Sequence, residues 1–326
     1  MSTHERIGIC LVWITWTTIA CGEPFTVVML PDTQIYSWKA PSVFRAQTQW
    51  IVDNRVKENI VFVTHVGDIV EHGNRESEWV HADTAMDILD GLLPYSVAIG
   101  NHDYDKENVL SPRGTAHHYI RHFGAARYEN RSWYGGSSTN ELNHYQFFDG
   151  SGQRFLHIVL EMETTNQAIE WARDILSKFP NTPTIMTIHM YLGIENGRPK
   201  RWPKRLLPTQ NPAGGHNSPE EIFQKLVSPF PNVLMVLNGH TGEQTHQTSI
   251  NAAGLPVFEM LANFQDRLGK GKMQGWLQLI TFDFDKKEIR VRTFSPILNH
   301  FETDKDSQFR FSLDLHDRFR VQVKPK

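Results

Sequence analysis

The sequence predicts an α/β fold, in which buried strands alternate with amphipathic helices. Three observations support this prediction. Short apolar runs rich in β-branched residues recur along the chain and are apolar on both faces, as in strands that helices cover. Segments with apolar residues three to four positions apart lie between these runs, as expected for helices. The 326 residues, of which 40% are hydrophobic, are enough for a sizeable core.

The first strands are expected where an apolar run ends in a polar residue. They are the runs 25–30, 60–66, 95–99, 184–188 and 233–237. Helices are expected at 44–56, 79–93, 168–179 and 218–227. The last helix has a clear start, with Ser218 as N-cap, Pro219 at the first position and Glu221 at the third.

The C-terminal part predicts a second, more antiparallel sheet. Its strands are expected at 255–262, 275–284 and 289–294, with one more strand pair within 308–323. Two loop-rich stretches, 104–143 and 193–217, are candidates for lids or binding loops. The second holds a basic cluster from Arg198 to Arg205 that suits an anionic substrate or a solvated loop.

Residues 1–22 are expected to be a signal peptide, with a single domain over 23–326. The apolar run Ile7 to Ala20 is shorter than the roughly 20 residues that span a bilayer but suits a signal segment. The residues that end at Cys21 loosely resemble a lipoprotein box. The alternative interpretation of the apolar run is a buried first strand. We therefore expect an exported protein that is periplasmic, extracellular or lipid-anchored, and that meets a membrane only if Cys21 is lipidated.

Composition excludes several classes of function. The net charge of −3 argues against a strongly basic nucleic-acid-binding surface. Only 2 Cys are present, Cys10 and Cys21, and both lie in the expected signal segment. A disulfide framework, thiol catalysis and cysteine-ligated zinc are therefore excluded from the expected domain.

Five predicted strands each deliver a polar side chain at or just after their carboxyl end. These side chains are Asp32, Asp68, Asn101, His189 and His240. Ligands of open α/β sheets collect at the carboxyl ends of strands, so we expect the five to converge. Carboxylates, an amide oxygen and imidazoles together suit a pair of divalent metal ions.

These blocks resemble those of the calcineurin-like metallophosphoesterases, whose pattern is Asp-x-His, Gly-Asp, Gly-Asn-His-Asp/Glu, His and Gly-His-x-His. The blocks here are Asp32-Thr33-Gln34, Gly67-Asp68, Gly100-Asn101-His102-Asp103, His189 and Gly239-His240-Thr241-Gly242. Asp-Thr-Gln in the first block, with Ala262-Asn263-Phe264-Gln265 downstream, is similar to a secreted bacterial-type branch. The resemblance implies a four-layer α-β-β-α sandwich of two mixed β-sheets, with metals at the carboxyl ends of the strands.

Two residues depart from the family pattern, because Gln34 and Gly242 replace histidines that bind the same metal. The resemblance leaves a second site intact, formed by Asp68, Asn101, His189 and His240. The first site keeps Asp32 and the bridging Asp68, and the Gln34 side-chain oxygen is a candidate ligand. By ligand softness this first site favours Mn²⁺, Mg²⁺, Ca²⁺ or Fe over Zn²⁺. His246 and His216 are weaker candidates for a replacement ligand.

The resemblance implies a phosphatase or phosphodiesterase with a phosphate-ester substrate. A hydroxide that bridges the two metals would attack phosphorus, and His102, held by Asp103, would assist the leaving group. The alternatives are a catalytically weak module that binds metal and phosphate, and an accessory domain anchored at the cell surface. Weaker candidates near the site are Glu71, His72, His65, Tyr36 and Trp38. The remaining loop histidines, His117, His118 and His122, are expected to be surface residues without partners.

Overall fold

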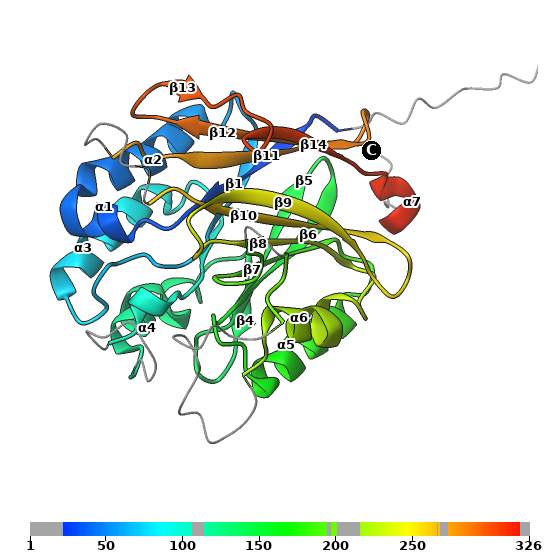
Figure 1. The fold of residues 1–326 in the computed structure, drawn as a ribbon, viewed down its shortest axis with the longest axis horizontal. Coiled ribbons are helices and arrows are strands. Elements are labelled where there is room, and N and C mark those ends of the chain that lie inside the picture. Colours follow the sequence, from blue (N-terminus) through cyan, green and yellow to red (C-terminus); the bar gives the residue numbers. More distant parts are fainter. Residues whose placement is uncertain are drawn as a thin grey trace, which may run out of the picture.

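The computed structural model describes residues 22–105, 114–193, 197–200, 216–265, 267 and 273–319. The expected signal segment with both cysteines, and Arg201, Lys204 and Arg205 of the basic cluster, lie outside these residues. Two seven-stranded mixed sheets, called sheet A and sheet B below, form the centre of the molecule (Figure 1).

Sheet A joins the N-terminal strands to the C-terminal ones. Its strands are β1 (Phe25–Leu30), β2 (Ile60–His65), β3 (Tyr95–Val97), β11 (Leu277–Asp283), β12 (Glu288–Ser295), β13 (His300–Phe301) and β14 (Gln308–Ser312). The order is β13-β12-β11-β1-β2-β3, and β14 also pairs with β12. β1, β2 and β3 are parallel, whereas β11 runs antiparallel to β1.

Sheet B contains the middle of the chain. Its strands are β4 (Tyr134–Ser137), β5 (His144–Gly150), β6 (Gln153–Leu160), β7 (Thr184–Ile188), β8 (Val233–Asn238), β9 (Glu243–Ile250) and β10 (Pro256–Asn263). The order is β4-β5-β6-β7-β8-β10-β9. The four strands β6, β7, β8 and β10 are parallel, so their carboxyl ends share one edge.

The helices follow the apolar periodicity of the sequence. They are α1 (Gln34–Lys39), α2 (Pro41–Asn54), α3 (Glu76–Met86), α4 (His117–Phe123), α5 (Asn166–Lys178), α6 (Pro219–Ile222) and α7 (Leu315–Phe319), with short helical turns η1 (Asp87–Leu89), η2 (Asn101–Asp103), η3 (Ala125–Arg127) and η5 (Phe223–Val227). Ser218 caps α6 in the predicted capping box with Glu221. Among the described helices, none combines the length and apolarity needed to cross a membrane.

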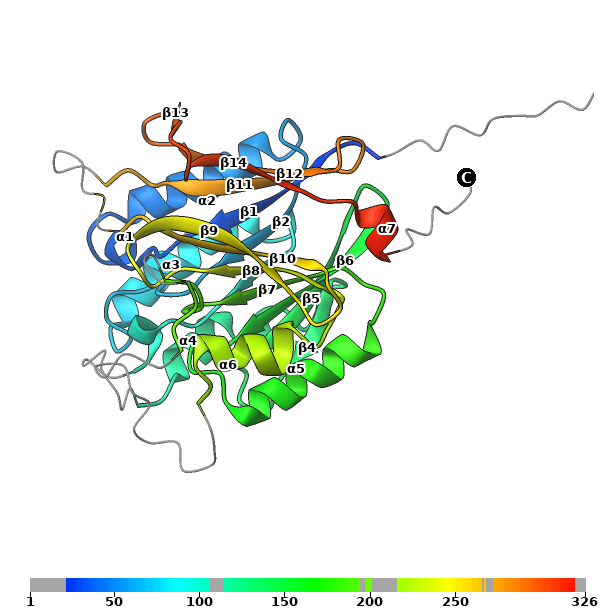
Figure 2. The same cartoon turned by 45° about the vertical axis from the view of Figure 1, so that its right-hand side comes forward.

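Alternate residues of the strands divide the core into layers. Val28 and Leu30 of β1 pack with the apolar faces of α2 and α3, whereas Val27 and Met29 pack against sheet B. The opposite face of sheet B packs on α5 and α6. The predicted sandwich of two mixed sheets in four layers is therefore confirmed, and Figure 2 shows α5 and α6 under sheet B.

Two predictions about the strands were wrong. The C-terminal strands do not form a sheet of their own, because residues 278–282 of β11 pair with β1 and extend sheet A. Only one strand, β14, forms within 308–323, where α7 replaces its expected partner among the described residues. The structure also adds β4, β5, β6 and β9, which the sequence analysis did not identify.

A chain of buried polar side chains connects the two sheets beneath their carboxyl edge. Ser96 donates to Thr64, Thr64 and Thr187 are 2.9 Å apart, and His157 Nε2 lies 3.0 Å from Thr187. Burial lowers the pKa of His157 well below its ordinary value, so the ring is neutral. These hydrogen bonds link β2 to β7 and thereby align the ends of strands from different sheets.

Phe25 supports the core between the sheets. Its ring is fully buried, stacks on Phe282 at 4.9 Å between centroids and meets the edge of Phe155 at 5.3 Å. We expect Phe25→Ala to lower the free energy of unfolding by about 3–5 kcal/mol, because the lost contacts leave a cavity. Urea unfolding measures the change. A loss below about 1 kcal/mol would contradict this view of the core.

Candidate metal centre

The predicted site residues lie where the carboxyl ends of the two sheets meet. Asp32 follows β1, Asp68 follows β2, and Asn101 follows β3, all from sheet A. His189 and His240 follow β7 and β8 of sheet B. The sequence predicted one shared edge, and the structure builds that edge from two sheets facing each other.

His189 is the centre of the arrangement. Its Nδ1 lies 2.9 Å from the carbonyl oxygen of Val66, which can only accept, so Nδ1 carries the proton. Its Nε2 lies 3.2 Å from Asp68 Oδ2, 3.3 Å from Asn101 Oδ1 and 3.2 Å from His240 Nδ1. A backbone partner that fixes one ring nitrogen while the other faces further ligands is typical of metal-binding histidines.

Asp68 is held in an unusual backbone conformation. Its φ is +50°, a left-handed conformation that Asp and Asn tolerate better than most residues. Oδ1 accepts the backbone N–H of His102 at 2.9 Å, which leaves Oδ2 toward His189. A Cβ at Gly100 would lie 2.2 Å from Oδ1, so the motif glycine is required for this approach.

Asp32 is held by groups from sheet B. Its Oδ2 accepts Asn263 Nδ2 at 2.9 Å and the backbone N–H of His240 at 3.1 Å. Asn263 also donates to the carbonyl of His240, so it positions both a carboxylate and a histidine loop. The sequence analysis noted Asn263 only within the resemblance and did not assign it this role.

Gln34 fits the predicted ligand role. Its side chain is buried at the start of α1, and its Oε1 is a buried atom without a hydrogen-bond partner among the described residues. Its Nε2 donates to Glu71 Oε2 at 3.2 Å, which fixes the orientation of the amide. An orphaned, oriented amide oxygen beside carboxylates is a suitable ligand for a hard divalent ion.

His102 contacts Glu71 and not Asp103. Nδ1 lies 2.9 Å from the Glu71 carbonyl and 3.5 Å from Glu71 Oε2. The carbonyl only accepts, so Nδ1 carries a proton and Nε2 is the nitrogen that can serve a substrate. Burial opposes a charged ring, but the Asp68 carboxylate and Glu71 outweigh it and raise the pKa of His102.

The prediction that Asp103 holds the His102 ring was wrong. Asp103 is fully buried and accepts the backbone N–H groups of Ile69 and Val70 through Oδ1, and of Gly100 through Oδ2. Burial raises its pKa to about 7, and the charge of Asp68 adds to this. Asp103 therefore fixes the loop after Asp68 against the loop that carries Asn101.

The charges of the centre are unbalanced without a cation. Burial raises the pKa of Asp32 well above its ordinary value, and the nearby Asp68 carboxylate raises it further. Burial opposes a charged His189, but Asp68 and Asp32 raise its pKa to about 9. The centre thus retains protons that a divalent ion would replace.

The donor set fits a metal ion. One ligand atom from each of Asp68, His189 and His240 lies within 4.8 Å of the others. Asn101 Oδ1 adds a fourth donor beside His189. Asp32 and Gln34 are buried and carry the oxygen atoms that the sequence analysis assigned to the first site.

The weaker candidates have separate roles. His65 is buried between Thr33 and the backbone of Gly67, and burial lowers its pKa to about 3. His72 contacts Glu78 at 2.8 Å. Tyr36 is buried and accepts the N–H of Gly275, and Trp38 is partly exposed at 38%.

The two histidines named as weaker candidates for a replacement ligand have partners outside the metal centre. His246 stacks on Phe309 at 3.7 Å, and His216 contacts Glu163 at 3.3 Å. Arg198 was expected in a loop that either meets an anionic substrate or is solvated, but its guanidinium pairs with the fully buried Glu259 at 2.6 Å and with Glu220 at 3.0 Å. It anchors its segment to sheet B.

The prediction that the loop histidines lack partners was wrong. His118 Nδ1 lies 2.7 Å from Asp105 Oδ1, and His122 Nδ1 lies 3.1 Å from Asp83 Oδ2. Trp79 stacks on both rings. These contacts fix the face of α4 that packs on α3.

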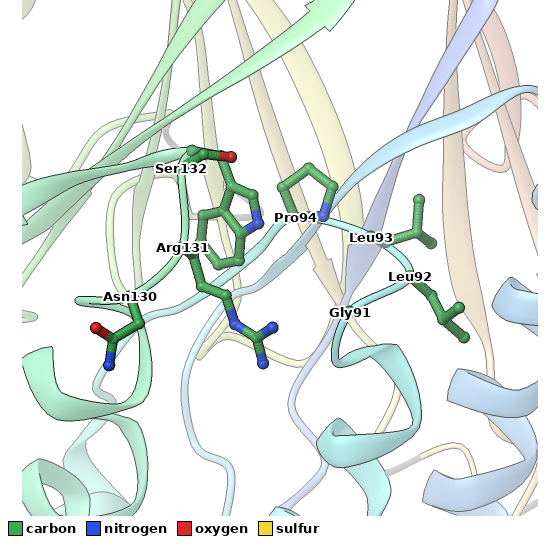
Figure 3. A pocket seen from close by; sticks show the side chains of 8 residues that line it. Gly91, Leu92, Leu93, Pro94, Asn130, Arg131 and Ser132 are labelled. Atoms are coloured by element: carbon green, nitrogen blue, oxygen red, sulfur yellow. The ribbon is translucent and has the colours of Figure 1, made fainter.

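A surface cavity of about 440 Å³ lies outside the metal centre, and Figure 3 shows the side chains that line it. It is formed by residues 91–94, which precede β3, and 130–133. Asn101 follows the other end of β3, so the cavity and the centre lie at opposite ends of that strand. Arg131 in the cavity wall pairs with Asp90 at 3.3 Å.

Gly239 leaves room for Asp32. A Cβ at this position would lie 2.0 Å from Asp32 Oδ1 and 2.6 Å from Val66 Cγ2. We expect Gly239→Ala to displace Asp32 and weaken metal binding at the centre by at least about tenfold. Metal titration of the full chain measures this. Gly193→Ala is the control, since its nearest neighbour lies at 3.4 Å, and equal affinity in both variants would contradict the role of Gly239.

Comparisons with known proteins agree with this geometry. The family model for calcineurin-like phosphoesterases matches residues 25–244. The uncharacterized protein YvnB of Bacillus subtilis (strain 168) is 33% identical in an alignment of 311 positions, which covers 91% of this chain and 22% of that protein. The chain therefore spans 22% of the length of this curated relative.

The chain is also similar to solved structures. Purple acid phosphatase PPD1 from seeds of yellow lupin (Lupinus luteus) superposes with a TM-score of 0.56 at 16% identity, covering 91% of this chain and 55% of that one. TT1561 of Thermus thermophilus gives a TM-score of 0.45 at 12% identity, covering 86% of this chain and 99% of that one. At 16% identity, the match to PPD1 supports the architecture alone.

Proposed function

The chain belongs to the calcineurin-like phosphoesterase family, and from this premise we propose that it is a hydrolase of phosphoric esters that uses two divalent metal ions. The observation that supports the proposal most strongly is the set of ligand atoms around His189 Nε2. Three donors from Asp68, Asn101 and His240 lie within 3.3 Å of it, while Nδ1 is fixed on a backbone carbonyl. Donor atoms from four residues that lie this close together are typical of a site where they bind the same cation.

We assign the residues to two neighbouring ions that share Asp68. Asp68, Asn101, His189 and His240 would hold one ion, and Asp32, Asp68 and the Gln34 oxygen would hold the other. When bound, two divalent ions activate a water and neutralise charge on a phosphate group. The oxygen-rich first site, with Asp32, Asp68 and Gln34, favours Mn²⁺, Mg²⁺, Ca²⁺ or Fe, and Zn²⁺ fits the second site with its imidazoles better.

The side chains around the ions have separate tasks. His102 is held by Glu71 and donates a proton from its ring to the leaving oxygen. Asp103 and Asn263 are positioning residues, because they hold the loops of Asp68 and the carboxylate of Asp32. The centre thus provides an acid beside fixed ligands, which a module that only binds phosphate does not need.

The substrate class is tested with two chromogenic esters. We expect the metal-loaded chain to hydrolyse p-nitrophenyl phosphate, bis(p-nitrophenyl) phosphate or both, and the ratio of the two rates separates a phosphatase from a phosphodiesterase. Bound metal and phosphate without turnover of either ester would instead support a binding module and contradict the proposal.

The Gln34 position controls metal preference in this scheme. We expect Gln34→His to raise the affinity of its ion site for Zn²⁺ relative to Mn²⁺ by about tenfold, because imidazole is a softer ligand than an amide oxygen. Competition between the two ions, measured by metal content, checks this. Gln49→His on the exposed side of α2 is the matched control. An unchanged preference would remove Gln34 from the ligand set.

Export is part of the proposal. It is supported by the apolar run that ends at Ala20 and by the small residues around Cys21. Expression of the full chain in a bacterium, followed by mass analysis of the mature protein, tests it. A chain that keeps residues 1–22 in the cytoplasm would contradict export, and a lipid on Cys21 would show anchoring.

A further inference from the structure

A smaller cavity opens at the carboxyl edge of sheet B. It has a volume of about 120 Å³ and lies between residues 138–143, which connect β4 to β5, and residues 161–171, which lead from β6 into α5. Its lining combines hydroxyl and amide side chains with the carboxylate of Glu161 and the indole of Trp171. We call it the α5 cavity.

The strand register places the α5 cavity next to the metal centre. Leu160 of β6 pairs with Ile188 of β7 in parallel. Glu161 and His189 directly follow these paired residues, so they continue neighbouring strands that lie about 5 Å apart. The cavity therefore begins one strand away from a predicted metal ligand, at the same edge of the sheet.

Glu161 is a buried carboxylate that favours a ligand with hydrogen-bond donors. Its side chain accepts Asn140 Nδ2 and Thr165 Oγ1, each at 3.2 Å. The Thr165 contact is longer than the about 2.5–2.7 Å typical of a hydroxyl on a carboxylate, so a ligand hydroxyl can form a closer bond. Burial raises the pKa of Glu161, and such a donor would replace part of the lost hydration.

The connection between β4 and β5 adds amide groups in fixed orientations. Asn140 Oδ1 accepts Ser138 Oγ at 2.6 Å and the backbone N–H of Leu142 at 3.2 Å, so its Nδ2 faces Glu161. Asn143 Oδ1 accepts the backbone N–H of Glu161 at 2.9 Å. Amide side chains offer donors and acceptors side by side, which matches neighbouring hydroxyl groups of a ligand.

The composition of the lining excludes two kinds of ligand. None of the described side chains that form the cavity is basic, so an anionic group would meet the Glu161 carboxylate without a counter-charge. A wholly apolar ligand would leave the carboxylate and the amides without the hydrogen bonds of water. Trp171 is half-buried against the core beside α5 and offers an apolar surface in the wall. A neutral ligand with several hydroxyls and an apolar face satisfies both groups.

We propose that the α5 cavity binds a sugar or polyol unit of the phosphate ester. The inference rests on the proposed hydrolase function, because the metal centre would hold the phosphate while the cavity holds the adjoining hydroxyls. The C–H groups of the unit pack on Trp171, and its hydroxyls donate to Glu161 and exchange hydrogen bonds with Asn140. The substrate class is then a sugar phosphate or a diester that contains a sugar or polyol.

Binding of neutral sugars tests the cavity without metal or turnover. The full chain is mixed with methyl α-D-glucopyranoside, methyl β-D-galactopyranoside or glycerol, and saturation-transfer NMR measures binding. We expect a signal from at least one of them, reduced at least about fivefold in Trp171→Ala and in Glu161→Gln. Glu161→Gln keeps the size of the side chain and stays decisive if Trp171→Ala does not fold. Glu170→Gln, with a side chain 75% exposed on the same helix, is the matched control. Absence of binding, or equal binding by all variants, would overturn the proposal.

Two esters connect the cavity to hydrolysis. D-glucose 6-phosphate and n-hexyl phosphate both release a primary alkoxide, but only the first carries further hydroxyls. We expect Trp171→Ala and Glu161→Gln to raise KM for the sugar phosphate by about tenfold and to leave kcat and the KM of the hexyl ester unchanged. An equal rise in KM for both esters would contradict a sugar subsite. Sugar binding without hydrolysis of any ester would contradict the hydrolase function and leave the cavity as a sugar site.

Discussion

We expect replacement of His102 with alanine to lower kcat by about 10²- to 10⁴-fold and to leave the metal content unchanged. The reason is that His102 is not a ligand in this arrangement. Its ring is fixed by the Glu71 carbonyl at 2.9 Å, and only its backbone N–H reaches Asp68. The variant therefore loses a proton donor but keeps the centre.

The dependence on leaving group separates this role from a general loss of structure. An ester with a poor alkoxide leaving group needs protonation more than p-nitrophenolate does. We therefore expect a larger loss in His102→Ala for an alkyl phosphate than for the nitrophenyl ester. His81→Gln is the control, because the His81 ring contacts the Ser37 carbonyl of α1 and not the site residues. Equal losses for both esters, or an unchanged rate, would contradict the acid role.

Asp68→Asn is expected to abolish turnover, with a loss of at least about 10³-fold in kcat/KM, or ~4 kcal/mol. Asp68 is the carboxylate that both proposed ions share, and an amide cannot supply its charge. Oδ2 lies 3.2 Å from His189 Nε2, so the change also removes a donor from the identified cluster.

The fold should tolerate this substitution. Asn accepts the left-handed conformation that Asp68 adopts at a φ of +50° and still accepts the His102 N–H through its side-chain oxygen. We expect a cooperative unfolding transition near that of the wild type together with reduced metal content. Asp53→Asn, on exposed α2, is the control. Full activity in Asp68→Asn would remove the shared carboxylate from the mechanism.

The strands that carry the site were predictable because each is a continuous apolar run that ends in a polar block. β1, β2, β7 and β8 lie where expected, and their terminal residues meet. β5 was not predicted because its apolar residues are interrupted by polar ones, and β9 was not predicted because it is almost entirely polar and mostly accessible to solvent. The pairing of β11 with β1 joins strands from opposite ends of the chain, which local patterns do not encode.

Side-chain partners were harder to predict than site membership. Asp103 stands next to His102 in sequence, and adjacency suggested a contact that η2 prevents by turning the two side chains apart. Arg198 was grouped with basic neighbours, yet it pairs with Glu259, which lies on a distant strand. Both errors come from tertiary contacts that replace what sequence neighbours suggest.

The central claim is that this chain uses two divalent metal ions to hydrolyse phosphate esters. The metal dependence of ester hydrolysis tests it most directly. The full chain is stripped of metal with a chelator, and Mn²⁺ is then added stepwise. The account predicts no hydrolysis of either nitrophenyl ester without metal, and a rate that reaches its plateau at two ions per chain. Full metal occupancy without hydrolysis, or equal hydrolysis by the stripped chain, would contradict it.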